Sequence, residues 1–456
     1  MHRRRSSSHL GARPCTRYAV AMPTIKPTLL VSAVSPESII ETVYQPDTAT
    51  TAFVVATDDG IATVSKVTVA GETHEPISPA NNLLKHRAVL LPSEPMEYGS
   101  NAELLAEIEA YLIRFVSLPP NALALTSAYI LLSWVYDAFN ELPYLRFRGD
   151  YGTGKTRALI AVGSLCHKAF FASGASTVSP IFHTLDTFRG TLIFDEADFR
   201  FTDEKAELVK IFNNGHAKGF PVLRAQVTQN RAFDPTAFFI YGPKIVGMRT
   251  AYQDRALESR FLTVEMEPGQ AAGIPISLPD AQKNEALTLR NKLLMYRLRN
   301  RRTVALNADL ADSSLEPRMN QILLPLLSVV GEDRHAAIRE VARRLQSGIV
   351  LERSGSTEGQ LLVVVSGMMA GGEASITLNG ITAAFQAVHG CDYERPVTVR
   401  WIGSMLRRLG IVFYKSNGAV VMGDWQDERI AMLCKRYGIE HRKASVAAKS
   451  GDEVTG

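Results

Sequence analysis

The chain has 456 residues and a mass of 50.0 kDa, which is room for about two to four domains and at least one large core. Apolar residues make up 46% of it and charged residues 21%, so fibrous, disulfide-scaffold and wholly disordered classes are excluded. The 50 basic and 46 acidic side chains give a net charge of +4, and the first acidic residue is Glu37. The cations that precede it are Arg3, Arg4, Arg5, Arg13, Arg17 and Lys26.

Residues 1–26 are expected to form a disordered basic arm, because arginines and small polar residues are frequent in it. No apolar run of seven or more residues precedes Met22, which argues against a signal peptide. Two other interpretations stay open: the arm contacts nucleic acid, or translation starts at Met22. The cysteines form no C-x-x-C pair, so we expect buried or idle thiols in a reducing cytoplasm. They are Cys15, Cys166, Cys391 and Cys434.

Residues 27–95 are expected to form a small β-rich module. Thr51–Ala56 and Ile61–Val69 are rich in β-branched residues, which favour strands. Asp58 and Asp59 precede Gly60 between these two runs, a sequence typical of a tight turn. A β-hairpin is therefore predicted here.

Residues 96–143 are expected to be a helical linker, with helices over 101–118 and 121–140. Phe115–Tyr136 carries no charged residue, so it is either a membrane span or a buried helix. Its two prolines and several polar residues favour a turn followed by a buried helix. We therefore expect no membrane association.

From Tyr144 onward short apolar strands alternate with helices, a pattern that predicts a parallel sheet with flanking helices and hence an α/β fold. This core is assigned to residues 144–270 and a helical lid to 271–350. Helices are expected to begin near Lys155, Ser179, Glu204 and Asp254. The expected strands are Tyr144–Arg148, Ala169–Ala172, Thr191–Asp195, Lys244–Met248 and Phe261–Glu265.

A glycine-rich stretch at the end of the first of these strands matches G-x-x-x-x-G-K-[ST] in full and opens a helix, the arrangement of a P-loop. Its glycines let the backbone fold closely around phosphate, and the helix N-terminus faces the anion. Lys155 is expected to reach the β- and γ-phosphates of ATP, and Thr156 to supply a hydroxyl to Mg²⁺. The predicted nucleotide-binding residues are Gly149, Asp150, Tyr151, Gly152, Thr153, Gly154, Lys155 and Thr156.

The strand Thr191–Asp195 ends in two carboxylates, which predicts the acidic partner of the P-loop. Asp195 is expected to hold Mg²⁺ and Glu196 to orient and polarise the attacking water. The next residues complete the letters D-E-A-D, ending at Asp198. We interpret this match to a helicase box as coincidence, because the remaining chain lacks the second motif set of those enzymes.

The strand Lys244–Met248 is followed by Arg249 and Thr250, and either residue fits a sensor of the γ-phosphate. No asparagine occupies this position. Asn213 and Asn214 are further candidates for the same role.

Two further arginines are candidates for contacts with the nucleotide. Arg260 follows a short helix and lies where an arginine finger would be placed, but Arg260 and Arg255 could also form surface ion pairs with Asp254 or Glu258. Arg318, at the start of a predicted helix, fits a second nucleotide sensor in the lid or an ordinary exposed helix terminus.

Residues 351–425 read as three helices and a hairpin with Asn-Gly at its turn, which predicts a winged helix. Residues 426–456 are expected to be a helical or disordered tail. Residues 395–449 contain 11 basic and 4 acidic side chains, so DNA is the expected partner, while a role in protein contacts stays open. The predicted DNA contacts are Arg400, Arg407, Arg408 and Lys415.

Residues 144–266 resemble the AAA+ group of the ASCE P-loop ATPases. The likeness lies in the stretches P-Y-L-R-x-x-G-D-x-G-T-G-K-T, G-T-L-x-x-D-E-A-D and D-x-A-L-E-S-R, which are similar to those of uncharacterised ATPases of phages and mobile elements. Superfamily III and minichromosome-maintenance helicases are more distantly similar. The short spacing from Lys155 to Asp195 and the missing sensor asparagine depart from the usual pattern.

The resemblance implies an ATP-hydrolysing, ring-forming homo-oligomer that acts as a DNA helicase or translocase in the replication of a phage or mobile element. A DNA-bound ATP switch, such as a helicase loader or regulator that unwinds nothing itself, is the alternative. A P-loop kinase is disfavoured, because a second carboxylate at Glu196 suits water better than a phosphate acceptor.

Overall fold

The computed structural model describes residues 28–119, 121–197, 203–227, 233–252, 254–268, 273–371, 373 and 375–441. The chain divides into two compact units, Met1–Asn81 and Asn82–Gly456. The predicted basic arm, Asp198 of the D-E-A-D letters and the end of the predicted tail lie outside the described residues.

The first unit contains two small sheets. One is antiparallel in the order β2-β3-β4-β5, and the other has the order β1-β7-β6. The predicted hairpin is confirmed, because Thr57 pairs with Gly60 across the turn. Its second strand is shorter than expected, since it ends at Val64 and the next strand pairs with β7 instead. The strands are β1 Thr28–Leu30, β2 Ser32–Val34, β3 Ile39–Gln45, β4 Thr50–Thr57, β5 Gly60–Val64, β6 Val67–Val69 and β7 Glu72–Pro76.

The second unit opens with helices α1 (Asn82–Lys85), α2 (Asn101–Phe115) and α3 (Ala122–Val135), followed by the 3₁₀ turn η1 (Tyr136–Ala138). The uncharged stretch forms α3, which is buried along most of its length. The Tyr129 hydroxyl donates to the Lys244 carbonyl at 2.9 Å, and the Trp134 indole donates to the Leu165 carbonyl at 2.8 Å. The expectation of a buried helix is confirmed. In the part of the chain that the structure describes, no helix has the length and apolar character to cross a membrane.

The central sheet has five parallel strands in the order β14-β8-β13-β10-β9. The predicted α/β class is confirmed, and each strand lies within one residue of its predicted bounds. Because the strands are parallel, the carboxyl ends of β8, β10 and β13 lie at one edge, with β13 between the other two. The strands are β8 Tyr144–Arg148, β9 Phe170–Ser173, β10 Leu192–Asp195, β13 Lys244–Met248 and β14 Phe261–Glu265.

Helices cover both faces of this sheet: α4 (Lys155–Gly163), α5 (Val178–Phe188), α6 (Asp203–Asn214) and the short α7 (Arg255–Glu258). On one face α4 packs so closely that a Cβ added at Gly163 would lie 2.9 Å from Ile193. On the other face the Phe212 ring of α6 lies 5.7 Å from that of Tyr144 and 6.4 Å from that of Phe194. Strand alternation thus divides the sheet residues between two helical layers.

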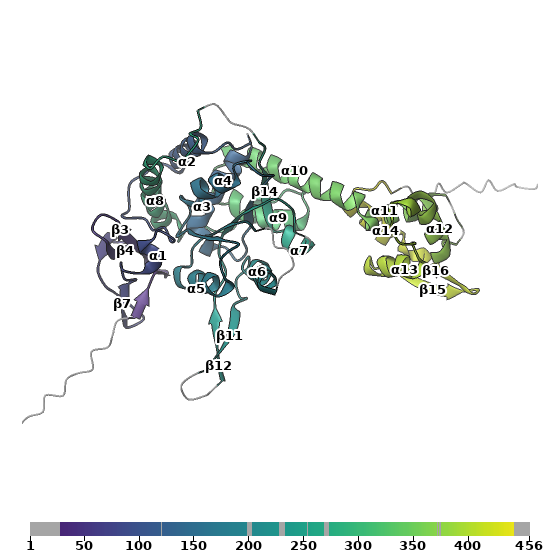
Figure 1. The fold of residues 1–456 in the computed structure, drawn as a ribbon, viewed down its shortest axis with the longest axis horizontal. Coiled ribbons are helices and arrows are strands. Elements are labelled where there is room, and N and C mark those ends of the chain that lie inside the picture. The colour runs from purple at the N-terminus through teal and green to yellow at the C-terminus, as the bar shows by residue number, and fades with distance from the viewer. Residues whose placement is uncertain are drawn as a thin grey trace, which may run out of the picture. The chain divides into compact units, whose positions relative to one another are not determined.

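A hairpin of β11 (Val222–Val227) and β12 (Phe233–Phe238) is inserted between α6 and β13. It extends away from the sheet beside α5 and α6 (Figure 1). The sequence did not lead us to expect it, because Pro235 interrupts the β12 pattern and removes a backbone donor.

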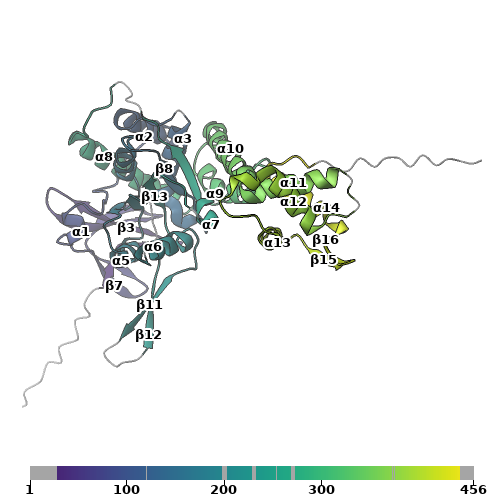
Figure 2. The ribbon, with the colours of Figure 1, turned by 45° about the vertical axis from the view of Figure 1, so that its right-hand side comes forward.

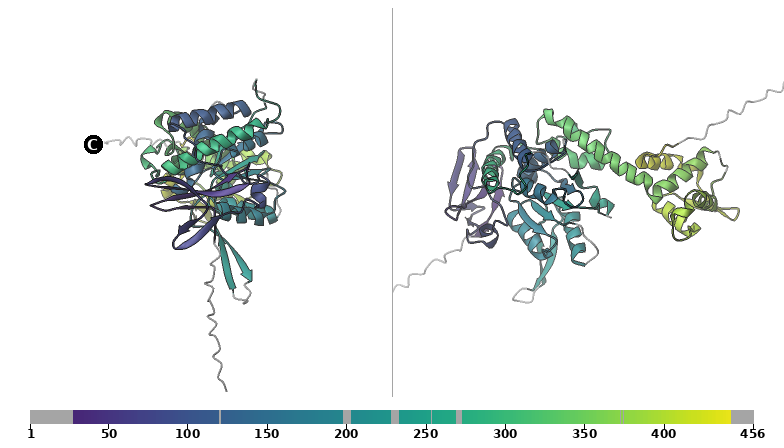
Figure 3. Two further views of the ribbon diagram at one scale, coloured as in Figure 1. Left: turned by 90° about the vertical axis from the view of Figure 1, so that its left-hand side faces the viewer. Right: turned by 45° about the horizontal axis from the view of Figure 1, so that its top comes forward.

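Beyond the sheet lie α8 (Ala281–Asn300), the 3₁₀ turn η2 (Ala308–Leu310), α9 (Pro317–Leu327) and α10 (Glu332–Gly355). Two arginines of α8 are buried rather than presented on its surface. Arg297 is 2% exposed and bonds to the Asp137 carboxylate at 2.9 Å, and Arg290 donates to the Ser164 carbonyl at 2.7 Å. Helix α10 runs without a break (right panel of Figure 3, green).

The C-terminal elements gather in one module (Figure 2). The predicted hairpin is confirmed: Ser416 pairs with Ala419, and Asn417 and Gly418 have φ angles of 48° and 79°. A backbone bond of 2.8 Å from Met422 to Ile376 adds a third short extended segment. Ile430 of the last helix is buried in the same core as α11 and α12. The elements are α11 Thr357–Ala370, α12 Leu378–His389, η3 Gly390–Asp392, α13 Val399–Arg408, β15 Phe413–Ser416, β16 Ala419–Met422, η4 Asp424–Gln426 and α14 Asp427–Tyr437.

Candidate functional site

The glycine-rich loop joins the carboxyl end of β8 to the start of α4, and its glycines each have a structural reason. Gly152 and Gly154 have φ angles of 72° and 85°, in the left-handed region where a side chain is strained. A Cβ added at Gly149 would collide with the Met266 carbonyl oxygen and lie 2.7 Å from the Thr153 hydroxyl. The tight loop therefore depends on glycine at all three positions.

The start of α4 is open toward this loop. Among the described residues, no side chain caps the helix at Gly154, the residue before Lys155. The Lys155 ammonium donates to the carbonyls of Gly149 at 2.8 Å and Asp150 at 2.6 Å, so it lies folded over the loop. An uncapped helix N-terminus beside a lysine is an arrangement that favours an anion.

The carboxylate of Asp195 meets the start of the same helix. The Thr156 hydroxyl donates to Oδ2 of Asp195 at 2.7 Å, and the Glu196 amide donates to Oδ1 at 2.9 Å. Gly247 of β13 leaves room for this carboxylate, since an added Cβ would lie 2.9 Å from Oδ1. Thr156 and Asp195, 39 positions apart in the chain, thus place a hydroxyl and a carboxylate side by side at the sheet edge, and we call this pair the oxygen corner.

Glu196 is exposed and has a φ of 58°, which is uncommon for a residue with a side chain. Its side chain lies beside the loop that follows β9, because a Cβ added at Gly174 would be 3.7 Å from Oε2 of Glu196. Strained backbone of this kind is often found at functional sites. The carboxylate of Glu196 is therefore open to solvent beside the loop that follows β9.

Arg249, at the end of β13, lies against the tip of the glycine-rich loop. Its guanidinium carbon is 3.9 Å from the centre of the Tyr151 ring, and Nη1 donates to the Tyr151 hydroxyl. Tyr151 is itself 72% exposed. The structure therefore brings Arg249 to the loop, as expected of a residue that senses phosphate, with Thr250 next to it in the chain.

Arg260 lies at the opposite edge of the sheet. It precedes β14, and its carbonyl accepts from the Tyr144 amide at 2.9 Å, at the start of β8. The glycine-rich loop follows the far end of β8, about 16 Å away at 3.3 Å per strand residue. Arg260 donates to Asn213, which donates to Asp254 at 3.0 Å, so Asn213 also lies away from the loop of its own chain.

Arg318, at the start of α9, belongs to the same edge and donates to Gln321. Burial lowers the pKa of Arg318 and of Arg260, and the nearby Arg260 guanidinium lowers the pKa of Arg318 further. Burial together with these two cations lowers the pKa of His216 to about 4. The edge therefore holds two partly desolvated arginines near the carboxylates of Asp254 and Glu141.

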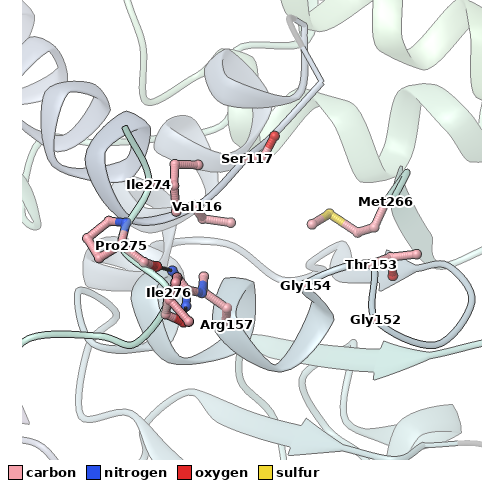
Figure 4. A pocket seen from close by; sticks show the side chains of 10 residues that line it. All are labelled: Val116, Ser117, Gly152, Thr153, Gly154, Arg157, Met266, Ile274, Pro275 and Ile276. Carbon is pink, nitrogen blue, oxygen red and sulfur yellow. Dashed lines mark hydrogen bonds between the residues drawn. The ribbon is translucent and has the colours of Figure 1, made fainter. Parts of the chain in front are cut away.

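A hollow of about 190 Å³ lies behind the glycine-rich loop (Figure 4). Most of its side chains are apolar, and its wall includes a segment that follows β14. Arg157 of α4 donates to the carbonyls of Pro275 and Ile276 and so holds that segment in place. The sequence did not reveal this hollow, since the two sides are more than 100 residues apart. The lining residues are Val116, Ser117, Gly152, Thr153, Gly154, Arg157, Met266, Ile274, Pro275 and Ile276.

The predicted DNA contacts of the C-terminal module are exposed. Arg400 and Arg407 are seven residues apart on α13 and so share one helix face. Arg408 lies 3.8 Å from Glu358, and Lys415 is on β15. All four predicted contact residues are thus exposed on α13 and β15.

No protein-family model matches the chain, and no curated protein matches it. Similar solved structures include the NrS-1 C-terminal region in its apo form (11% identity, 84% of this chain and 95% of that chain, TM-score 0.36) and the active helicase Cch of SCCmec type IV (13% identity, 90% and 97%, TM-score 0.38). The Thermotoga maritima RuvB Holliday junction branch migration motor is similar at 13% identity, over 71% and 96% of the two chains, with a TM-score of 0.23. Similarity at this level assigns the chain to no family, so its function has to be argued from its own residues.

Proposed function

We propose that the protein is an AAA+ ATPase that couples ATP hydrolysis to DNA remodelling, as a helicase or translocase in phage or mobile-element replication. The observation that carries the ATPase part is the hydrogen bond of 2.7 Å between Thr156, at the start of α4, and Asp195, at the end of β10. It joins the glycine-rich loop to an acidic strand end, and this pairing is what phosphoryl transfer from a nucleotide requires.

ATP is the proposed substrate of the glycine-rich loop. The open N-terminus of α4 and the Lys155 ammonium would bind its phosphates, after Lys155 leaves the loop carbonyls of Gly149 and Asp150. The hollow behind the loop would hold the base, since its side chains are mostly apolar and a base presents flat apolar faces.

Mg²⁺ fits the oxygen corner of this site. Thr156 and Asp195 would hold it, because a hydroxyl and a carboxylate are the oxygen ligands that this ion prefers. Among the described residues, no group of three or more His, Cys, Asp or Glu could hold a metal, which agrees with an ion bound by few protein ligands and by phosphate. When bound, the ion neutralises charge on the phosphate oxygens.

Glu196 is the proposed general base. It is exposed at the sheet edge beside Asp195, so water reaches it, and it does not take part in the bond between Thr156 and Asp195. Arg249 is the proposed sensor, since it already contacts the loop through Tyr151 and carries a fixed positive charge. Thr250 is the alternative sensor.

Arg260 is proposed to act on the nucleotide of a neighbouring subunit, and Arg318, at the same edge, is proposed to be a second nucleotide sensor. Their edge of the sheet lies one strand length from their own loop, and a partly desolvated cation is ready to bind phosphate charge. This division of the site supports a homo-oligomeric ring.

The C-terminal module is proposed to be a winged helix that binds DNA through Arg400, Arg407, Arg408 and Lys415. Three helices, the β15–β16 hairpin and the exposed cations on α13 support this proposal. We also propose that the domains follow one another along the chain in the order expected from the sequence: basic arm, β module, helical linker, ATPase core, lid and winged helix.

ATP turnover of the purified chain, measured with and without single-stranded and duplex DNA, tests the proposal. We expect basal turnover that DNA stimulates, together with strand displacement. Turnover without displacement would favour the alternative, a DNA-bound ATP switch such as a helicase loader. An absence of turnover under all conditions would overturn the ATPase assignment.

A further inference from the structure

The C-terminal module carries a pair of aromatic rings that its core does not use. The rings of Tyr414, on β15, and Trp425, in η4, are stacked with centroids 6.0 Å apart and planes inclined by 20°. Trp425 is 70% exposed and Tyr414 is 39% exposed. Trp401 in the same module differs, because it packs edge-on against Tyr393 at 5.3 Å and is 37% exposed.

We propose that Tyr414 and Trp425 form a stacking platform for an unpaired base of single-stranded DNA. The proposal rests on the proposed binding of DNA by this module and names the form of DNA that it recognises. A stacked aromatic pair in water exposes flat π-faces, which any base can cover, so such a platform needs no particular sequence.

The backbone fixes the Trp425 ring before any ligand arrives. The ring lies against Gly423, where an added Cβ would be 2.7 Å from two of its carbons. The next residue, Gln426, is bonded through its side chain to both the amide and the carbonyl of Val412, each at 2.6 Å. A ring held in this way loses little conformational freedom on binding, which favours affinity.

The charge of the module that carries the platform matches a nucleic-acid strand. Lys415 is on the same strand as Tyr414, with its side chain on the other face of the hairpin, and Arg400 is on α13; both cations are exposed. Residues 395–449 contain 11 basic and 4 acidic side chains. Aromatic rings beside cations that follow a phosphate backbone are the combination found in single-strand binding surfaces. An apolar protein partner would gain nothing from this charge.

The test compares binding of the full chain to a fluorescein-labelled oligothymidylate and to a blunt duplex of the same length, by anisotropy. We expect Trp425→Ala to weaken single-strand binding by about 5- to 100-fold, the loss typical of one stacked base. Duplex affinity should change less than about twofold, since duplex bases are already stacked. The salt slope should stay unchanged, because the variant loses no phosphate contact.

Two further variants separate stacking from general damage. Trp425→Phe keeps an aromatic face and should restore most of the single-strand affinity. Met432→Ala removes another exposed apolar side chain, 52% exposed on α14, and should leave both affinities unchanged. Thermal unfolding of each variant checks that the module is folded.

The outcomes are distinguishable. Wild-type protein that binds neither DNA would overturn the proposed function and this inference together. Wild-type protein that binds both, with Trp425→Ala unchanged or weakened equally for both, would overturn this inference alone. Loss of self-association in Trp425→Ala, seen by light scattering with DNA affinity intact, would show that the platform binds a second copy of the chain instead.

Discussion

Gly247 of β13 faces the carboxylate of Asp195 across one strand spacing, and a Cβ at this glycine would lie 2.9 Å from Oδ1 and 2.8 Å from a methyl carbon of Leu159. The proposed metal-binding carboxylate can therefore keep its position only because residue 247 of the neighbouring strand has no side chain beyond a hydrogen atom.

Gly247→Ala should displace Asp195 and lower ATP turnover by about tenfold or more, with a loss of about 1–3 kcal/mol in the free energy of unfolding from overpacking. Turnover as a function of Mg²⁺ concentration measures the effect and should shift to higher Mg²⁺. Gly348→Ala is the control, since no described atom lies within 4 Å of the added carbon. Wild-type behaviour of Gly247→Ala would show that Asp195 does not need its observed place.

Lys155→Ala and Glu196→Gln should separate binding from hydrolysis. Lys155→Ala should weaken nucleotide binding by about 10- to 100-fold, because a charge-assisted bond to phosphate is lost. Glu196→Gln should keep the affinity and lower turnover by about 100-fold or more, because the general base is removed. Nucleotide titration and phosphate release measure the two quantities, with Glu340→Gln on α10 as control. Unimpaired turnover in Glu196→Gln would remove this residue from the reaction.

Arg260→Ala should bind ATP normally and hydrolyse it about 1,000-fold more slowly, if the arginine stabilises phosphoryl transfer in a neighbour. An arginine in an exposed ion pair, such as Arg344 with Glu340, contributes only about 0–1 kcal/mol of stability, so Arg344→Ala is the control. Mixing Arg260→Ala with Lys155→Ala should restore part of the activity, because some junctions then combine an intact loop with an intact arginine. No recovery in confirmed mixed assemblies would contradict a shared site.

Charge reversal of Arg407, Arg408 and Lys415 to glutamate should weaken DNA binding while leaving basal ATP turnover intact. Each lost phosphate contact should lower the slope of log K against log salt by about 0.9. Affinity measured over a range of salt concentrations checks this, with Arg344→Glu as a matched reversal elsewhere. Equal affinity at low salt would assign the module to protein contacts.

Lys244 should make stability depend on pH. Its side chain is fully buried, and burial lowers its pKa from 10.5 to about 7, while its ammonium donates to three backbone carbonyls. Between these values the unfolded chain binds a proton that the folded chain releases, so the free energy of unfolding should rise with pH, by at most about 1.4 kcal/mol per pH unit. Lys244→Met should remove this slope between pH 7 and 9, whereas Lys210→Met should keep it. Urea unfolding across this range provides the measurement.

The positions of the strands along the chain were easier to predict from the sequence than the order of the strands in the sheet. The strands ending at Arg148, Asp195 and Met248 were found because each is a short, mostly apolar run followed by polar residues or glycine. The C-terminal hairpin was found because Asn417-Gly418 favours positive φ. The order of strands was not predictable, since periodicity along the chain does not say that β13 lies between β8 and β10.

The candidate site was predictable only where its residues are local in sequence. The loop and Thr156 lie in one stretch, whereas the bond from Arg157 to Ile276 spans 119 residues and leaves no local signal. The contact of Arg249 with Tyr151 likewise depends on the strand order. For Arg260, a short helix and its end were predictable from the sequence, but the partner Asn213 appears only in the fold.

Arg260 lies at the sheet edge opposite its own glycine-rich loop, and this position affects how many complete ATP sites an assembly contains. If each complete site joins the loop of one subunit to the arginine of the next, an open arc of subunits always has one complete site fewer than it has chains. Only closure makes the two numbers equal. Turnover per chain should then rise with the number of subunits in the open assembly and reach its maximum when the ring closes. Dilution that removes one subunit from a ring would therefore lower ATP turnover before any bound nucleotide is released.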